Sequence, residues 1–256
     1  MPGKYSIPNL ANACKVLKFL GQNDIGYLVT EIAKELSLPA TSALRIVSTL
    51  VDEGLLRKEN GKIFLGSVLI HLGSRATAGT EIRDLALPVL KSLTLTTDET
   101  SHLALPCDDR SLIVAVQNSP HPLRAASSPG TLADLYFSST GKVFLAFLHR
   151  HRIPEILDRY PAVRRTDKSL TSLTELEAAA DESLLRGYGV DDEEFNPGVR
   201  CLAAPVRGPG GQVVAAIGIT AATVRFTSDR IPEMATKVIT AANELSRLIG
   251  NHSVTN

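Results

Sequence analysis

Side chains suited to binding or catalysis gather in the second half of this 256-residue chain. Ser138, Ser139 and Thr140 precede an apolar run that is typical of a helix. This position favours an anion, because the first N–H groups of a helix are free and its dipole is positive there. The same cluster is also typical of an ordinary helix cap. The sequence therefore offers a candidate anion site beside a plain structural interpretation.

A catalytic alternative rests on a cysteine and a histidine. Cys201 could act as a nucleophile with His102 as its base, but no third group to orient the pair is evident. A thiol in a strand is more often a buried apolar filler. The Gly141-Lys142 pair lacks the other residues of a phosphate-binding loop, and no GxSxG motif occurs. An enzyme using Cys201 remains the alternative to a binding protein.

Metal-binding patterns are absent from the sequence. His149 and His151 are two residues apart, so on a helix they project to different faces. The acidic run 191–194 lacks the alternating oxygen ligands and the glycine of a calcium loop, and it is interpreted as a solvated loop. The three cysteines are far apart and form no CxxC motif. We expect no metal and no cofactor.

The elements that would position these side chains change in character along the chain. Residues 68–95 show mainly helical spacing of apolar residues, with bends suggested at Gly73 and Gly79. After Thr97 a two-residue period begins, and strands and helices then intermingle, which predicts an α+β domain with an antiparallel sheet. The expected strands pair as 102–106 with 111–116 and as 201–207 with 212–220; the expected helices are 142–149, 152–159, 172–186 and 231–249.

The first seventy residues predict a winged helix-turn-helix. Three short helices are indicated, with apolar sets Leu10, Ala13, Cys14, Leu17 and Leu20, then Ile32, Ala33 and Leu36, then Leu44, Val47, Leu50 and Val51. The tight turn between the second and third helices is typical of the helix-turn-helix. Two short strands, 55–58 and 63–65, flank an Asn-Gly turn, which is the strongest short hairpin signal.

A DNA-binding surface follows from this arrangement, because the third helix of such a domain enters the major groove and the wing contacts the backbone. Hydroxyl and guanidinium groups on that helix would contact bases or phosphates, and basic groups on the wing would contact phosphates. A winged helix that binds protein is the alternative. The candidate residues are Thr41, Ser42, Arg45, Ser48 and Thr49 on the helix, and Arg57, Lys58 and Lys62 on the wing.

The charge balance looks unfavourable for a nucleic-acid partner, since 27 basic and 27 acidic side chains cancel. The charges are unevenly placed, however. Residues 1–73 hold eight basic and six acidic side chains, and the remainder holds 19 and 21. The N-terminal excess has the sign expected of a domain that meets phosphate. It is small, so useful affinity should require two or more copies on paired half-sites.

The composition also bears on the compartment. About 44% of the residues are apolar, as in folded globular proteins. The longest uncharged stretches, such as 212–224, are too short for the roughly 20 residues that span a bilayer. No cleavable signal is evident at the N-terminus, and the cysteine usage suits a reducing environment. We therefore expect a cytoplasmic protein without a membrane partner.

The chain resembles the IclR family of bacterial transcription regulators from about Leu10 to Gly250. A winged helix in front of a sensor domain is part of the likeness, and two motifs match in order. The matching stretches are Thr30–Pro39, Leu44–Leu50 and Glu53–Leu56 in the first motif, and Gly187–Glu194 and Asn196–Val206 in the second.

The resemblance implies a ligand-controlled regulator, most simply a repressor, that binds double-stranded operator DNA. It implies three parts: a winged helix-turn-helix domain over 1–73, linker helices over 74–96, and a GAF-like α/β effector-binding domain with an antiparallel sheet over 97–256. It also implies a homodimer or a tetramer built as a dimer of dimers. Family effectors are mostly carboxylic, keto or aromatic acids, so the expected partner is a small organic acid that controls DNA binding allosterically.

The resemblance also assigns effector-binding positions one by one. Family members often carry serine at the two positions on the last strand, where this chain has Gly218 and Thr220, so one hydroxyl is missing here. We add His102, Asp134 and Tyr136 as conjectured polar contacts, with core packing as the alternative for each. The positions that the resemblance assigns are Ser139, Thr140, Asp191, Cys201, Gly218 and Thr220.

Overall fold

The computed structural model describes residues 7–22, 25–77 and 81–252. The contacts between residues divide the chain into two compact units, Met1–Gly79 and Thr80–Asn256, which are described separately below. No helix in the described part of the chain is long and apolar enough to cross a membrane.

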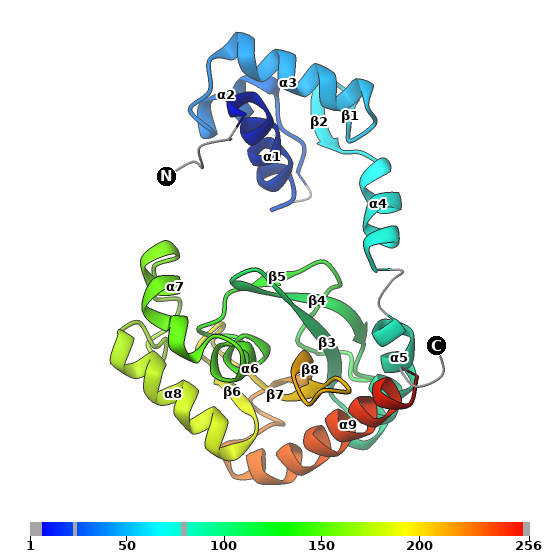
Figure 1. Cartoon of the computed structure of the whole chain (residues 1–256), viewed down its shortest axis with the longest axis vertical. Helices are drawn as coiled ribbons and strands as arrows, with labels where there is room; N and C mark the ends of the chain where they lie inside the picture. Colours follow the sequence, from blue (N-terminus) through cyan, green and yellow to red (C-terminus); the bar gives the residue numbers. More distant parts are fainter. Residues whose placement is uncertain (1–6, 23–24, 78–80, 253–256) are drawn as a thin grey trace. The chain divides into compact units, whose positions relative to one another are not determined.

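The N-terminal unit is a three-helix bundle with a two-stranded wing (Figure 1). Its core is formed by buried side chains from all three helices and both strands, among them Val16, Ile32, Val47, Leu56 and Ile63. The elements are helices α1 (Pro8–Leu20), α2 (Val29–Glu35) and α3 (Ala40–Asp52), strands β1 (Leu56–Glu59) and β2 (Lys62–Leu65), and helix α4 (Val68–Thr77).

The wing follows the turn chemistry that the sequence predicts. Glu59 pairs with Lys62, which leaves a two-residue loop of Asn60 and Gly61. Both loop residues have positive φ, 50° and 81°. A two-residue turn of this type matches the twist of the strands that it joins, and asparagine and glycine tolerate it best. The hairpin prediction is confirmed; the first strand is shifted by one residue toward the turn, and the second begins one residue earlier than expected.

The apolar faces of two helices differ from the sequence prediction. Leu10 is 60% exposed and Cys14 is also exposed, while Val16 is fully buried in α1. Leu44, expected in the core, is 58% exposed, and Ile46 takes its place. The buried stripe of α3 is rotated by roughly one residue from the predicted stripe, because each position advances about 100° around a helix. Leu44 therefore lies on the outer side of α3.

The C-terminal unit is built on a six-stranded sheet in the order β5-β4-β3-β8-β7-β6. Each neighbouring pair of strands is antiparallel, as predicted, and both expected hairpins form. The two short edge strands were not anticipated. The strands are β3 (Thr100–Cys107), β4 (Arg110–Gln117), β5 (Leu132–Ala133), β6 (Gly189–Asp192), β7 (Val199–Arg207) and β8 (Val213–Ala222).

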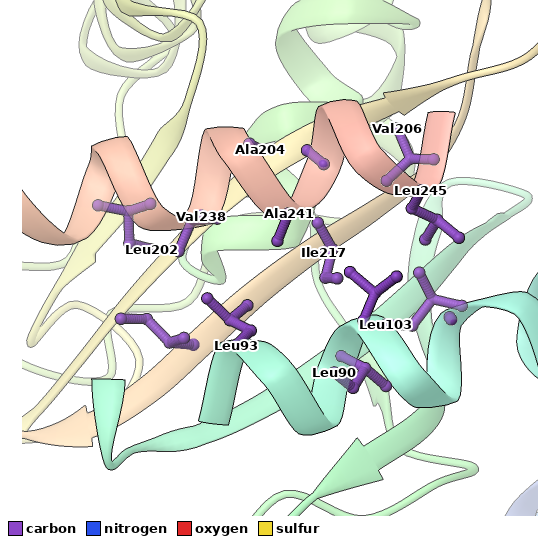
Figure 2. Packing of buried hydrophobic residues seen from close by; sticks show 14 of the residues in the cluster. Leu90, Leu93, Leu103, Leu202, Ala204, Val206, Ile217, Val238, Ala241 and Leu245 are labelled. Atoms are coloured by element: carbon purple, nitrogen blue, oxygen red, sulfur yellow. The ribbon is translucent and has the colours of Figure 1, made fainter. Parts of the chain in front are cut away.

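Two helices cover one face of this sheet, α5 (Glu81–Thr97) and α9 (Ile231–His252). Figure 2 shows Leu93 of α5 and Val238 of α9 approaching strand side chains such as Ile217. Apolar residues recur every three or four positions along both helices, so each buries one stripe against the sheet. The larger core of the unit lies here, and α5, within the segment expected as linker, belongs to that core.

The opposite face carries α6 (Ser139–Phe147), α7 (Ile153–Arg159) and α8 (Leu173–Arg186). Helix α6 lies directly on the strands and is almost entirely buried, with Phe144 and Leu145 in the second core. A capping box begins α8, since Ser172 accepts from the Glu175 N–H and Glu175 accepts from the Ser172 N–H. The burial of α6 holds this helix against the sheet.

The acidic run 191–194 is not a solvated loop, and that prediction was wrong. Asp191 and Asp192 belong to β6, and both Asp191 and Glu194 are buried. Basic groups pair with the other acids: Glu194 with Lys142, Glu193 with Lys168, and Asp192 with Arg200 and Lys168. The four acids are tolerated together because neighbouring cations compensate their charge. Asp191 and Glu194 are buried, while Asp192 and Glu193 remain partly exposed beside their basic partners.

Candidate effector site and DNA-binding face

A cavity of about 180 Å³ lies between the sheet and the N-terminal end of α6. Side chains from all six strands or from the loops that follow them reach it, so the whole sheet contributes to one site. Three alanines, Ala125, Ala126 and Ala133, form part of its wall. The remaining lining residues are His102, Ile113, Ser127, Thr131, Ser138, Ser139, Thr140, Asp191, Phe195, Asn196, Val199, Cys201 and Thr220.

A row of polar groups crosses the sheet at the base of this cavity. Asp191 of β6 pairs in register with Cys201 of β7, and Cys201 pairs with Thr220 of β8. Cross-strand neighbours lie on the same face, so the three side chains are adjacent. The Cys201 thiol hydrogen-bonds to both neighbours, and Thr220 Oγ1 lies 3.4 Å from His102 Nδ1. Carboxyl, thiol, hydroxyl and imidazole therefore form one connected strip.

The N-terminal end of α6 faces the same cavity. Ser138 caps the helix, since its Oγ accepts from the Gly141 N–H at 3.1 Å and its carbonyl accepts from the Lys142 N–H. The amides of Ser139 and Thr140 precede the first intrahelical bond and have no partner within the helix. The helix cap anticipated for the Ser/Thr cluster is therefore present at Ser138, and the N–H groups of Ser139 and Thr140 are the ones that a candidate anion site would use.

Asp191 has the most unusual electrostatic environment in the site. Its Oδ1 accepts from the N–H of Glu194 at 2.8 Å and from the N–H of Phe195 at 3.2 Å. Burial raises the pKa of Asp191 to about 7, although these two hydrogen bonds lower it. The nearby Glu194 raises the pKa further, and Lys142 lowers it. Near neutral pH, Asp191 therefore exchanges between its neutral and ionised forms.

The proposed nucleophile and base are both poorly suited to catalysis. Burial raises the pKa of the Cys201 thiol well above its ordinary value, and the neighbouring Asp191 raises it further. A neutral thiol is a weak nucleophile. Burial also lowers the pKa of His102 to about 4, so the imidazole is neutral. The pair offers hydrogen-bonding groups to a ligand but not an activated thiolate.

Five of the six positions expected at the effector site line this cavity, and Gly218 is not among them. Gly218 pairs with His102 and Ala203 inside the sheet. A Cβ at this position would lie 2.4 Å from the carbonyl oxygen of Leu202, so only glycine fits between the strands. Of the conjectured additional contacts, His102 lines the cavity, whereas Asp134 and Tyr136 face a different hollow.

That second hollow has a volume of about 510 Å³ and lies beside the β3–β4 turn and the α7 end. Its charged groups already have protein partners. Arg159 pairs with Asp109, and Arg165 pairs with Asp134. The Tyr136 hydroxyl donates to the carbonyl of Tyr160. The charged side chains of the second hollow are therefore already engaged with protein partners.

The loop side of this cavity was not predicted from the sequence. Ser127, Thr131 and Asn196 add polar groups there, and Phe195 adds an aromatic wall. Residues 118–131 carry no helix or strand periodicity, so nothing in the pattern places them over the sheet. Asn196 alone had a signal, because it lies within the motif that the family resemblance singled out.

The predicted DNA-contacting residues of α3 occupy two neighbouring rows. Thr41, Arg45 and Ser48 are exposed and lie opposite the buried stripe. Ser42 and Thr49 lie to one side and line a groove of about 460 Å³ between α1 and α3. The Thr49 hydroxyl donates back to the Arg45 carbonyl at 2.9 Å. The outer row is therefore the part of α3 best placed to reach base edges.

The exposed Leu44 adds an apolar side chain beside this row. An apolar group on a recognition helix can contact the methyl group of thymine. The apolar spacing predicts Leu44 in the core, so this residue was not among the expected DNA contacts. A regular apolar spacing cannot distinguish a core leucine from one at the edge of the stripe.

The three basic residues of the wing differ in whether they already form an ion pair. Arg57 pairs with Glu59 and lies 4.6 Å from the centre of the Phe64 ring. Among the described residues, neither Lys58 nor Lys62 has an ion-pair partner, and both are exposed. The two lysines are therefore the wing cations readily available to a phosphate backbone. The described residues also contain no group of three or more side chains able to hold a metal ion.

Comparison with known families matches both units. The family described as the IclR helix-turn-helix domain matches residues 9–60. The family described as the bacterial transcriptional regulator IclR C-terminal matches residues 74–247, which is more than half of the chain.

Individual proteins agree with these matches. The HTH-type transcriptional regulator KdgR of Escherichia coli is 30% identical over 250 residues, which cover 96% of this chain and 94% of KdgR. The Transcriptional repressor IclR of the same organism is 28% identical, covering 97% and 92%. A crystal structure of an IclR homolog from Microbacterium hydrocarbonoxydans complexed with 4-hydroxybenzoate shares the fold, with a TM-score of 0.78 at 21% identity over 94% of this chain and 98% of that one.

The two family matches lie in the order of the two units, and neither supports the interpretation of Cys201 as a catalytic nucleophile. The chain is a regulator and not an enzyme. The winged helix-turn-helix, the antiparallel sheet with its covering helices and the two matches together identify this protein as a member of the IclR family of bacterial transcriptional regulators.

Proposed function

We propose that this regulator is a repressor that binds operator DNA through its winged helix. Binding of a small organic acid determines whether it releases or retains that DNA. The acid occupies the cavity between the sheet and α6. The observation that carries this proposal is the convergence of the N-terminal end of α6 and a polar strip of the sheet on one cavity. The protein acts in the cytoplasm, where bacterial operator DNA is found.

An acid suits this cavity because the amides of Ser139 and Thr140 lie at the positive end of α6. Anions bind well at such positions. Thr220, Cys201 and His102 supply hydrogen bonds to the rest of the ligand, and Phe195 and Ile113 supply apolar contact. The related structure with 4-hydroxybenzoate supports an aromatic or similarly sized acid. The absence of Gly218 from the lining is consistent with a contact set that differs from that of serine-containing relatives.

On the DNA side, Arg45, Thr41 and Ser48 read the major groove while Lys58 and Lys62 contact phosphates. Ser42 and Thr49 contact the backbone at the edge of α3, and Arg57 assists when its pairing with Glu59 opens. This division follows from their exposure and ion pairing. Base contacts specify sequence, whereas phosphate contacts position the protein.

Affinity for an operator requires more than one copy of the chain, because the N-terminal unit carries only a small positive excess. A homodimer, or a tetramer built from two dimers, places paired winged helices on paired half-sites. Helix α4 offers exposed apolar side chains to such an assembly, Ile70 at 72% exposure and Leu72 at 50%. Exposed apolar groups of this kind are typical of protein–protein contacts.

The proposal is tested by a gel-shift assay with the DNA upstream of the regulator's own gene, with and without a panel of organic acids. We expect binding that one or more acids weaken. Thr220→Val should abolish the response to the acid while preserving DNA binding, because it removes one cavity hydroxyl with little change in shape. The control is Thr236→Val on the exposed side of α9. Failure to bind this DNA under any condition would refute the proposal.

A further inference from the structure

The effector cavity presents an electrostatic problem for an acid. No lysine or arginine is among the described residues that line it. Lys142 lies close by, but its ammonium group pairs with Glu194. The only carboxyl group in the lining is Asp191, which is 2% exposed. An ionised effector and an ionised Asp191 would therefore place two negative charges in one poorly solvated space.

The surroundings of Asp191 do not compensate a second negative charge. From α6 it faces Lys142, and from the following loop it faces Glu194, so these two charges largely cancel. From β7 it faces the Cys201 thiol, which burial keeps neutral. From β3 the cavity receives His102, whose pKa is lowered to about 4. Like charges at short distance in a buried site are costly, so one of them is neutralised by a proton.

We propose that an acidic effector enters this cavity together with one proton, which Asp191 holds while its carboxyl O–H donates a hydrogen bond to the effector. This inference rests on the proposed function, in which the effector is an acid. The stoichiometry of binding is one effector anion and one proton from water for each site, and no covalent bond of the effector changes. The ionised form of Asp191 excludes the anion, and the neutral form admits it.

Local geometry gives the neutral form a donor without disturbing the fold. Oδ1 of Asp191 is occupied by the N–H groups of Glu194 and Phe195, both of which require an acceptor. The proton is therefore carried on the other oxygen. Asparagine reproduces this arrangement, because its carbonyl accepts the same two N–H groups and its amide donates in place of the O–H. Asp191→Asn is accordingly a permanent imitation of the protonated side chain.

The pH dependence that follows has a definite sign. With a pKa of about 7 in the free protein, Asp191 is mostly neutral at about pH 6 and mostly ionised at about pH 8. The affinity for an acid should fall roughly tenfold between these values, and at the higher pH each acid should bring close to one proton. A neutral amide analogue meets no charge repulsion, so its affinity should remain constant.

The experiment uses the full-length protein. Acetate, pyruvate, benzoate and 4-hydroxybenzoate are first screened by thermal shift at about pH 6. The acid that binds is then titrated calorimetrically beside its amide, at about pH 6 and pH 8, in phosphate and in Tris. The difference in heat between the two buffers counts the protons taken up, and it needs no variant to fold.

Three variants locate the proton. Asp191→Asn should bind the acid equally at both pH values without proton uptake, and its thermal melting shows that it folds. His102→Gln alters one contact of the acid and should change its affinity, but the number of protons taken up per bound acid should stay the same. Glu193→Gln, which changes a nearby acid that pairs with Lys168 outside the cavity, should behave as the unchanged protein does.

The outcomes separate the two proposals. Binding of the acid without proton uptake and with equal affinity at both pH values refutes proton-coupled entry but leaves the proposed function standing. Loss of uptake in His102→Gln, with retention in Asp191→Asn, refutes the assignment to Asp191. If no acid binds at either pH to protein that still binds its promoter DNA, the acidic effector of the proposed function is wrong, and this inference falls with it.

Discussion

Burial, more than residue type, determines the charge state of the ionisable side chains at the candidate site. His102, Asp191 and Cys201 are ionisable groups buried where charge is unfavourable. Burial lowers the pKa of His102 and raises the pKa of Asp191 and Cys201, and each shift favours the neutral form. A site built of neutral hydrogen-bonding groups recognises a ligand without reacting with it. Cys201 and His102 looked like catalytic candidates in the sequence, because the sequence does not reveal how far each is removed from water.

The lowered pKa of His102 makes stability depend on pH. In the unfolded chain the imidazole takes up a proton near its ordinary pKa of 6.5, whereas in the folded protein it does so only near 4. The unfolded state therefore binds more protons between these values, and stability falls as the pH falls through that window. We expect a loss of about 2 kcal/mol from this group between pH 7 and pH 5.

The measurement is urea unfolding of the full chain at both pH values, followed by circular dichroism. His102→Gln should show a smaller loss on acidification than the unchanged protein. His151→Gln, which alters an exposed histidine, is the matched control. Equal losses for His102→Gln and the unchanged protein would contradict the buried, neutral imidazole.

Arg45 is the residue on which sequence specificity should depend most. It is exposed on α3 opposite the buried stripe, and its guanidinium can donate two hydrogen bonds to one guanine edge. Arg45→Ala should weaken operator binding by about 1–3 kcal/mol and relax the preference at one base position. Competition gel-shifts with single-base operator variants test this. A loss that is equal on all DNA sequences would instead identify Arg45 as a phosphate contact.

The helices and strands were easier to predict than which of their side chains are buried. Turn and cap residues act locally, so the Asn60–Gly61 hairpin and the Ser172 capping box could be recognised from the sequence alone. The edge strand β6 could not, because its two aspartates are tolerated only through partners distant in the chain, such as Arg200 and Lys142. The outward rotation of Leu44 likewise depends on how α3 packs against its neighbours.

The turn of the wing depends on the backbone conformation of Gly61. Gly61 has a φ of 81°, and no atom lies within 4 Å of where its Cβ would be. Gly61→Val therefore meets only backbone strain, and it should destabilise the hairpin by about 1–2 kcal/mol. Because the wing holds Lys58 and Lys62, DNA affinity should fall by a similar factor on every sequence.

Thermal melting and gel-shifts at two salt concentrations provide the readouts. Asn60→Gly is the matched control, since glycine accepts the φ of 50° at that position without strain. A variant Gly61→Val with unchanged melting and unchanged DNA affinity would show that the wing tolerates a different turn.

At the scale of the molecule, two units with opposite charge excess divide the work of reading DNA and sensing a ligand. The division was visible in the sequence, since helical, hairpin and mixed periodicities follow one another along the chain. The role of α5 was not, because the same helical pattern suits a free linker and a helix packed on a sheet. Its buried residues Ala86, Val89 and Leu90 join the core of the C-terminal unit, so α5 is part of that unit and not a free linker.

Coupling between the two sites must be reciprocal. If an acid lowers operator affinity by some factor, operator DNA must lower affinity for that acid by the same factor, typically about 5–150-fold for allosteric proteins. Titrating the acid into free and DNA-bound protein measures one factor, and gel-shifts with and without the acid measure the other. Equal affinity of the acid for both forms of the protein would exclude allosteric control by that acid.

The three alanines in the cavity wall have a consequence for how such regulators diversify. Ala125 and Ala126 belong to an irregular loop, and Ala133 lies in the short edge strand β5, so none of them forms part of the central ladder of the sheet. Replacing one with glycine or valine would enlarge or reduce the chamber while the strands keep their register. New inducer preferences can therefore arise by single substitutions, both in natural evolution and in the construction of biosensors from this scaffold.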